Sequence, residues 1–353
     1  MKRILRILFL AGMEVCATCN GQTVGSPQSS EYPGREWKKC AQPETLGWSV
    51  QKLAAAREYS QKIGSAAVVI VQGGIVVDEW GDTTKKFNIH SIRKSLLSSL
   101  YGIAIRDNKI RLTDTLQDLG IDDVEPRLTS SEKQAQVIDL LKARSGIFHP
   151  ALYETSAMKN KPPRGSHPHG TFWLYSNWDF NALGTIYERA MNSSIFIQFK
   201  KEIADPIEMQ DFVLDDTKYI SGTESMHAAY PFRMTARDMA RFGLLYLRKG
   251  EWRGKQIVPR SWVIESTTPY SDAGPKGGYG YLWWCAIDGR LFPSVNLAGA
   301  YVAWGIGGHY ILMMPDIDTV VVHRFNTDAD DDAPGITEQQ FGMLVSLIRA
   351  AKQ

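Results

Sequence analysis

The chain has 353 residues, of which 44% are hydrophobic and 22% are charged, and its formal net charge at pH 7 is +2. This is the composition of a globular protein long enough to bury a large core, and it excludes a disordered or fibrous chain. No basic stripe with interleaved aromatic residues points to nucleic acid as a partner. Beyond the N-terminus, no stretch of about 18 uninterrupted apolar residues could span a membrane.

The first 20 residues have the organisation of a secretory leader. A basic start is followed by an apolar stretch over residues 4–12 and by small residues near position 17, although Glu14 interrupts the pattern. The leader interpretation predicts export, to the periplasm or outside the cell, and leaves a lipid anchor open; a disordered start is the alternative. Residues 21–45 are polar and rich in Gly, Ser and Pro, which predicts a linker.

A helix and a hairpin are expected after the linker. Residues 49–64 predict a helix that ends at Gly64. Residues 66–81 contain two β-branched runs on either side of Gly73-Gly74, which predicts a β-hairpin. A second helix is expected from Ser91 to about residue 106.

The middle of the chain predicts mainly helices with long loops, and an amphipathic helix over 235–250 ends it. Strand patterns then follow at 279–287, 308–315 and 318–326, and one last helix is expected at about 338–351. Strands near both ends predict an α+β fold, in which one antiparallel sheet is flanked by the terminal helices and carries an inserted helical part. We expect one domain to span 46–353, with the sheet part at about 46–90 and 251–353 and the helical part at about 91–250.

The cysteines and histidines do not predict a metal site. Cys16 and Cys19 form a C-x-x-C that lies in the leader, and His167-x-His169 lacks a third zinc ligand. The acidic run at 328–332 lacks the ligand spacing of a calcium loop and predicts a solvated loop. We therefore expect no metal and no cofactor.

Cys40 and Cys285 are the cysteines outside the leader. In an exported protein they could form a disulfide bridge, but the sequence cannot test the geometry that such a bridge requires. We expect this bridge to matter for stability only if the protein is exported.

The helix that begins at Ser91 carries the first chemical signal, a Ser-x-x-Lys pair with Lys94. Residues three apart share a helix face, so the amine can reach the serine hydroxyl. Burial favours a neutral lysine, which can take the serine proton and activate the nucleophile. The free N–H groups of the helix N-terminus can bind an oxyanion. Three further pairs occur, but none of them starts a helix with so apolar a continuation: Ser49/Lys52, Ser130/Lys133 and Ser156/Lys159.

The second signal is Tyr175-Ser176-Asn177, the only Tyr-x-Asn in the chain. Beside a lysine, the Tyr175 hydroxyl could relay protons to a leaving group, and Asn177 could bind a substrate carbonyl. The alternative is a helix cap made by Ser176 or Asn177, with Tyr175 packed in the core.

The third signal is "YVAWGIGGHYILMMP" over residues 301–315. Gly305, Gly307 and Gly308 allow the backbone to approach another group closely, as in an edge strand that lines a cleft. A bulge in a core strand is the alternative. His309 fits a packed or bridging histidine as well as a substrate contact.

These three motifs, in this order and spacing, resemble those of the serine β-lactamase and penicillin-binding-protein superfamily. The class C β-lactamase-related esterases and amide hydrolases are the most similar branch. The resemblance covers roughly residues 50–350 and implies a β-lactamase/transpeptidase-like fold. It includes "VIDLLKARSGI" at 137–147, similar to the family's "LLTMTSG", and residues 230–263, similar to its "SARDLARFGLLYLNKG" segment.

The resemblance also implies roles for single residues. Ser91 resembles the acylated nucleophile, Lys94 its base, Tyr175 the second proton-transfer group and Asn177 a substrate-amide contact. The family's Lys-Thr-Gly is replaced here by Trp304-Gly305-Ile306, which we expect to line the substrate site together with His309. The groups that hold a penicillin carboxylate are therefore missing, which disfavours β-lactam hydrolysis. The backbone N–H near Ile306 can still supply half of an oxyanion hole.

The leading hypothesis is a serine hydrolase that cleaves an ester or amide of a small molecule or peptide through an acyl-enzyme. A D-alanyl-D-alanine carboxypeptidase or a β-lactamase is the alternative within the superfamily. A catalytically silent binder of cell-wall peptides is the alternative from another class. The retained Ser–Lys–Tyr set argues against it, because a binder needs no base.

Overall fold

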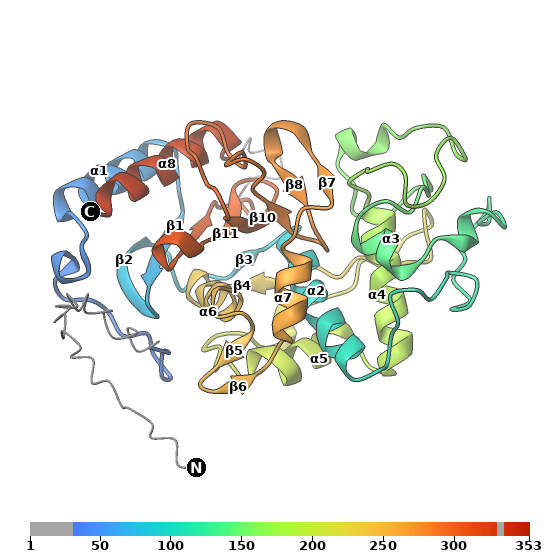
Figure 1. The fold of residues 1–353 in the computed structure, drawn as a ribbon, viewed down its shortest axis with the longest axis horizontal. Helices are drawn as coiled ribbons and strands as arrows, with labels where there is room; N and C mark the ends of the chain where they lie inside the picture. Colours follow the sequence, from blue (N-terminus) through green and yellow to red (C-terminus); the bar gives the residue numbers. More distant parts are fainter. Residues whose placement is uncertain (1–30, 330–334) are drawn as a thin grey trace, which may run out of the picture. The chain divides into compact units, whose positions relative to one another are not determined.

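The centre of the fold is an antiparallel sheet of eight strands in the order β2-β1-β12-β11-β10-β9-β8-β7 (Figure 1). The structure is a computed structural model that describes residues 31–329 and 335–353. Strands from both ends of the chain meet in the sheet, because β1 (Ala67–Gln72) pairs with β12 (Thr319–Arg324) on one side and with β2 (Ile75–Gly81) on the other. The predicted α+β fold with one antiparallel sheet is confirmed.

The glycine-rich motif forms the end of an interior strand. β10 (Tyr301–Gly305) pairs over its whole length with β11 (His309–Met314), but with β9 (Trp284–Cys285) only at its first two residues. β10 is therefore not the edge strand that its glycines suggested, although its C-terminal half extends beyond β9. The sheet ends with β8 (Gly278–Tyr279) and β7 (Ser271–Asp272).

Helices bury both faces of the sheet. In β1, Val68 and Ile70 belong to the hydrophobic cluster under α1 (Val50–Lys62) and α8 (Glu338–Ala351), which lie side by side over one face (Figure 1). Val69 belongs to the cluster on the opposite face, because successive side chains of a strand alternate between faces. The hydrophobic runs of the predicted hairpin thus fill two cores.

α6 (Ala236–Leu247) covers that opposite face and packs against β1, β11 and β12. Gly243 permits this contact, because a Cβ there would lie 2.6 Å from Val320 and 2.7 Å from Ile311. The sequence assigned this helix to the helical part, residues 91–250, whereas its contacts join it to the sheet.

α2 (Ile92–Arg106) lies between the sheet and the helical part. It contacts strands β10 and β11 of the sheet. It also contacts three helices, α4 (Asn177–Met191), α5 (Ile195–Phe199) and α7 (Arg260–Ser266). Residues 92–104 of α2 are all buried, as its apolar continuation predicted. The remaining elements are α3 (Val137–Leu141), which packs on α4, and two small ladders, β3 (Phe87–Asn88) with β4 (Arg233–Met234) and β5 (Glu251–Trp252) with β6 (Lys255–Gln256).

Cys40 and Cys285 do not form the disulfide bridge that the sequence left open, because both residues are free thiols. The N–H of Cys40 donates to Val76 of β2, and Cys285 lies in β9. Four strands separate β2 from β9 in the sheet. At about 4.8 Å between neighbouring strands, the two residues lie far beyond the Cα separation of about 7 Å that a disulfide tolerates.

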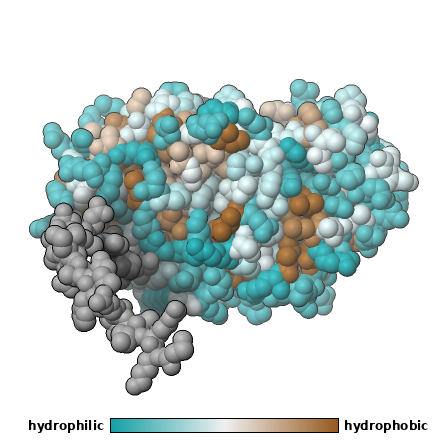
Figure 2. Space-filling model, viewed as in Figure 1, coloured by the Kyte–Doolittle hydropathy of each residue, from teal (hydrophilic) through white to brown (hydrophobic). Residues whose placement is uncertain are grey.

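The surface shown in Figure 2 is mainly hydrophilic, with separate hydrophobic areas. Within the described residues, no helix is long and apolar enough to cross a membrane. The leader predicted over residues 1–20 lies outside the described residues.

Candidate active site

The first turn of α2 brings the predicted nucleophile and base together. Ser91 immediately precedes α2, and its carbonyl accepts a hydrogen bond from the N–H of Lys94 at 3.0 Å. Lys94 Nζ lies 2.7 Å from Ser91 Oγ and 2.8 Å from the hydroxyl of Tyr175. Tyr175 is 81 positions away in the sequence, so the fold joins two motifs that no local pattern connects.

Lys94 is placed where a charge is unfavourable. Its side chain is 1% exposed, and its Nζ lies 4.5 Å from the ring centre of Tyr175 and 4.8 Å from that of Phe180. Burial, and secondarily the positive charge of Arg93, lowers the pKa of Lys94 well below its usual value. The amine therefore loses its proton more readily than an exposed lysine does, which suits it to accept the serine proton.

Tyr175 is suited to donate a proton. Its ring packs against Phe180 at 4.9 Å and Trp284 at 5.4 Å between ring centres, just before α4. Burial raises the pKa of the Tyr175 phenol above its usual value, and a hydrogen bond with Ser91 opposes that shift. The hydroxyl thus stays protonated over the physiological pH range.

Asn177 keeps one polar atom free. It begins α4 and is 2% exposed, and its Nδ2 donates to the backbone carbonyls of Leu152 and Tyr153. Its Oδ1 has no hydrogen-bond partner in the described part of the chain. The helix is capped by Ser176 instead, whose Oγ accepts from the N–H of Trp178 at 3.2 Å. The Nδ2 that would bind a substrate carbonyl is therefore engaged within the protein, contrary to the expectation from the sequence. The free Oδ1 suits a substrate N–H instead, and this contact stays a prediction.

The end of β10 approaches the nucleophile closely. A Cβ on Gly305 would lie 2.5 Å from the carbonyl O of Ile89 and 3.3 Å from the Cβ of His90, so only glycine fits this contact. Ile306, the next residue, is 54% exposed. Within residues 31–329 and 335–353, no acceptor binds the backbone N–H of Ser91 or of Ile306. Both N–H groups are thus free donors, and they belong to segments that contact each other at Gly305 and His90.

Two of the residues expected to contact substrate, Trp304 and His309, have side chains that are engaged within the protein. The ring of Trp304 packs on Phe292 and Tyr310, on the face of the sheet that α1 and α8 cover and therefore opposite to Gly305. His309 is fully buried and bridges Thr327 and Arg324, which is the bridging role that the sequence left open. The alternation of the strand directs Trp304 away from the Gly305 face. His309 lies on the same face as Gly305, beside His90, but both of its ring nitrogens are bonded to Thr327 and Arg324.

The other three Ser-x-x-Lys pairs are structural or exposed. Ser49 caps α1 and accepts from the N–H of Lys52, whose Nζ donates to the carbonyl of Ala350. Lys133 pairs with Asp122 at 2.6 Å. Ser156 lies in an exposed 3-10 turn. Only Ser91 combines a buried lysine with a tyrosine.

The described residues contain no cluster of three or more His, Cys, Asp or Glu side chains that could hold a metal ion. His167 stacks on Phe172 with ring centres 4.0 Å apart, and His169 pairs with Asp139 at 2.9 Å. Each histidine of the His167-x-His169 segment thus contacts a different side chain of the protein.

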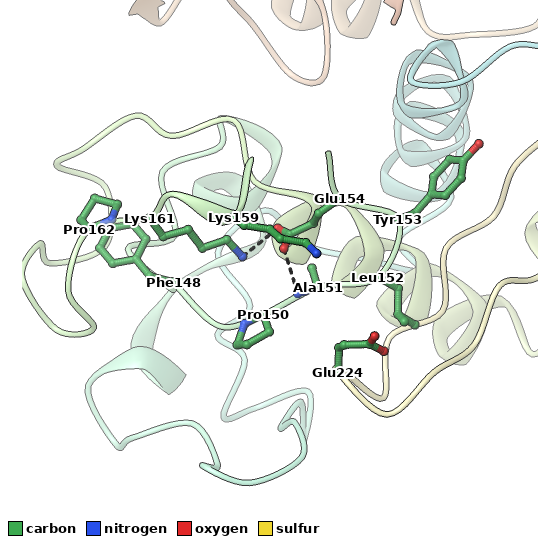
Figure 3. Close-up of a pocket in the computed structure, with 10 residues that line it drawn as sticks. All are labelled: Phe148, Pro150, Ala151, Leu152, Tyr153, Glu154, Lys159, Lys161, Pro162 and Glu224. Atoms are coloured by element: carbon green, nitrogen blue, oxygen red, sulfur yellow. Dashed lines mark hydrogen bonds and ion pairs between the residues drawn. The ribbon is translucent and has the colours of Figure 1, made fainter. Parts of the chain in front are cut away.

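A cavity of about 620 Å³ borders the segment that carries Leu152 and Tyr153, whose carbonyls hold Asn177. Figure 3 shows the ring of Tyr153 pointing away from this cavity, and the Tyr153 hydroxyl accepts from Asn88 Nδ2 at 2.7 Å. Glu154 and Lys161 form an ion pair in its wall at 2.7 Å. The cavity adjoins the Asn177 end of the site, and no pattern in the sequence predicted it.

Four residues of the site were not predicted from the sequence: His90, Arg93, Phe180 and Thr327. His90 precedes the Ser-x-x-Lys motif and Arg93 lies within it, so both could have been noticed for their position alone. Phe180 and Thr327 enter only through tertiary contacts with Lys94 and His90.

Comparisons with known proteins identify the family of this chain and proteins that share its fold. The Beta-lactamase family model matches residues 50–341. A 6-aminohexanoate-dimer hydrolase of Paenarthrobacter ureafaciens is 31% identical over 126 residues, which are 33% of this chain and 30% of that protein. The chain thus matches less than a third of the length of this curated relative.

Solved structures share the fold. A Bacillus anthracis protein, provisionally named a 6-aminohexanoate-dimer hydrolase, has a TM-score of 0.64 at 20% identity, over 91% of this chain and 88% of its own. EstCE1, a hydrolase with promiscuous acyltransferase activity, has a TM-score of 0.62 at 16% identity, over 88% of this chain and 98% of its own. Because the family model matches most of the length of this chain, the chain belongs to the serine β-lactamase and penicillin-binding-protein superfamily of hydrolases.

Proposed function

We propose that the protein cleaves an ester or amide through an acyl-enzyme formed on Ser91. The observation that carries this proposal is the position of Lys94 Nζ, 2.7 Å from Ser91 Oγ and 2.8 Å from the Tyr175 hydroxyl in a buried site. A neutral amine at that position is a base for the serine and can reprotonate the tyrosine.

The acylation step follows from these contacts. Lys94 takes the Ser91 proton while Oγ attacks the substrate carbonyl carbon, and the negative oxygen binds the N–H groups of Ser91 and Ile306. The bond to the leaving group then breaks, and that group receives the proton of the Tyr175 hydroxyl. Lys94 returns its proton to Tyr175, which leaves a neutral base. Water attacks the acyl-enzyme by the same route, releasing the acid and restoring Ser91.

The third motif supports simple esters or amides rather than β-lactams. Trp304-Gly305-Ile306 offers backbone N–H groups but neither a cation nor a hydroxyl for a lactam carboxylate. The curated relative is named as a hydrolase of a 6-aminohexanoate dimer, which supports a substrate other than a β-lactam. We therefore expect nitrocefin to be turned over much more slowly than p-nitrophenyl esters.

One screen tests the proposal. Purified protein is assayed with p-nitrophenyl esters, nitrocefin and D-Ala-D-Ala peptides, and a fluorophosphonate adduct is located by mass spectrometry. We expect ester hydrolysis, labelling of Ser91 and loss of both in Ser91→Ala. Ser130→Ala is the matched control, because Ser130 belongs to an exposed Ser-x-x-Lys pair and should leave activity unchanged. An adduct on another serine, or full activity in Ser91→Ala, would contradict the mechanism. Release of D-alanine or nitrocefin turnover equal to that of esters would favour the superfamily alternatives.

We also propose export of the protein on the basis of the N-terminal 20 residues alone. N-terminal sequencing of the protein isolated from its native cells tests this. A start near residue 18 supports a cleaved leader, and an intact Met1 in the cytoplasmic fraction would contradict export.

A further inference from the structure

The residue before the nucleophile has a backbone conformation that side chains disfavour. His90 has φ +49°, in the left-handed region. Such a conformation persists only when the surroundings fix it. The N–H of His90 donates to Asn88 Oδ1 at 2.9 Å, and its ring Nε2 lies 2.8 Å from Thr327 Oγ1. A threonine 237 positions away thus holds the residue that places Ser91.

Thr327 also contacts the histidine that ends the glycine-rich turn. His309 Nε2 lies 3.2 Å from Thr327 Oγ1, and its Nδ1 accepts from Arg324 Nε at 2.9 Å. Because arginine only donates, His309 carries its proton on Nε2 and donates it to Thr327. The single hydroxyl proton of Thr327 is then available to His90 Nε2. A directed chain of hydrogen bonds therefore runs from Arg324 through His309 and Thr327 to His90.

The charge state of the two rings agrees with this chain. Burial, and secondarily the Arg324 cation, lowers the pKa of His90 to about 4 and that of His309 well below its usual value. Asp328 opposes the shift of His90. Both imidazoles are neutral near pH 7, so each has one donor and one acceptor nitrogen.

The chain ends at the two segments that supply the free N–H groups. His90 precedes Ser91, and His309 pairs in register with Gly305, the neighbour of Ile306. These segments are in direct contact, because a Cβ on Gly305 would lie 3.3 Å from the Cβ of His90. Thr327 therefore binds both sides of this contact at once.

We propose that His90 and Thr327 are positioning residues that fix the separation of the Ser91 and Ile306 N–H groups. The inference rests on the proposed acyl-enzyme function. An oxyanion exists only in the transition state and the tetrahedral intermediate, so a displaced hole lowers kcat while substrate binding is largely kept. The reacting groups remain Ser91, Lys94 and Tyr175.

Thr327→Val tests the proposal, because it removes both hydrogen bonds and keeps the side-chain volume. We expect kcat for a p-nitrophenyl ester to fall by about tenfold to a hundredfold, with KM changed by less than about twofold. Inhibition by an arylboronic acid, whose tetrahedral adduct occupies the hole, should weaken by a similar factor. Thr327→Ser restores the hydroxyl and should keep most of the wild-type kcat. His90→Gly allows the left-handed backbone without the ring and should lose kcat as Thr327→Val does.

Thr185→Val is the matched control. Thr185 Oγ1 lies 2.9 Å from His227 Nδ1 in a second, partly buried threonine–histidine pair. Thr185 lies in α4 and His227 lies in a loop, and neither is a residue of the site. We expect its melting temperature to change about as much as that of Thr327→Val, with kcat unchanged.

Two results would overturn the inference: a wild-type kcat in Thr327→Val, or equal losses of kcat in Thr327→Val and Thr185→Val that follow their melting temperatures. If Thr327→Val does not fold, His90→Gly replaces it in the comparison with Thr185→Val. A wild-type kcat in His90→Gly would then overturn the inference. A wild-type protein that neither hydrolyses esters nor is labelled at Ser91 would instead contradict the proposed function.

Discussion

Arg93 and Lys94 place two basic side chains next to each other in a buried site. Arg93 is fully buried, its guanidinium lies 4.1 Å from the ring centre of Tyr230, and its Nη2 donates to Asn181 Oδ1 at 3.0 Å. Its Nε and Nη1 have no partner among the described residues. Since arginine stays protonated, the repulsion between the two groups is relieved by loss of the Lys94 proton. Arg93 thereby favours the neutral form of Lys94 that the proposed mechanism requires.

The pH dependence of the activity should show this effect. The proposed mechanism requires neutral Lys94, and burial, followed by the charge of Arg93, lowers the pKa of this amine. We therefore expect kcat/KM to rise as the pH rises through this lowered pKa and to level off above it. Arg93→Met removes the cation and should move the acid limb to higher pH by about one unit. The pH profile of kcat/KM measures the shift.

Arg241→Met is the control for that measurement. Arg241 is also fully buried, and it donates to the carbonyls of Ile207 and Gly34 from α6, away from Lys94. We expect its acid limb to stay at the wild-type position even if stability falls. An unchanged limb in Arg93→Met would show that burial alone sets the pKa of Lys94.

Tyr175→Phe should make the rate depend on the leaving group. The phenol is kept protonated by burial, and its task is to donate a proton. We expect alkyl esters to lose about a hundredfold or more in kcat/KM, whereas p-nitrophenyl esters should lose much less because nitrophenolate leaves without a proton. Tyr153→Phe, which removes a hydroxyl bound to Asn88, should affect both ester classes alike. Equal losses for both classes in Tyr175→Phe would contradict proton donation.

At the scale of elements, the close contact of α6 with the sheet depends on one glycine. A Cβ on Gly243 would lie 2.6 Å from Val320 Cγ1, below any ordinary contact distance. We expect Gly243→Ala to destabilise the protein by about 1–3 kcal/mol, because overpacking outweighs the gain in helix propensity. Denaturant unfolding measures the change. Gly34→Ala is the control, since its Cβ would meet nothing closer than 3.9 Å. A stability gain in Gly243→Ala would show that the helix shifts to accommodate the methyl group.

Elements with a clear periodicity were predicted closely. The final helix, expected at about 338–351, is α8 (Glu338–Ala351), and the helix over 49–64 is α1 (Val50–Lys62), capped by Ser49. The segment 279–287 was predicted as one strand but contains two short ones, because Leu282, with φ +65°, turns the chain between them. A positive φ at a leucine leaves no trace in a hydrophobic pattern.

At the scale of the whole molecule, the sheet keeps the two described cysteines apart. Cys40 is partly exposed, and burial raises the pKa of the Cys285 thiol. In native protein prepared without reductant, we expect Cys40 to react with a thiol reagent and Cys285 to react only after unfolding. Thiol titration with and without denaturant, compared with Cys40→Ser, measures this. A native protein with no reactive thiol, and a melting temperature lowered by reductant, would contradict two free cysteines.

The sequence by itself determined the family and selected the candidate nucleophile and base. The Ser-x-x-Lys spacing fixes Ser91 and Lys94 on one face of a helix whatever surrounds it, because helix geometry is local. The apolar continuation of that helix implied burial, and burial implied a neutral amine. The order of the three motifs then supported the β-lactamase-like fold, which the family match over residues 50–341 confirms.

Only the tertiary structure decided which side chains complete the site. The contact between Lys94 and Tyr175 and the contact between His90 and Thr327 join residues 81 and 237 positions apart. The direction of Trp304 depends on the register of β10, since a shift of one residue exchanges the two faces of a strand. Long-range contacts and strand register arise from packing of the whole chain, so no local pattern of residues contains them.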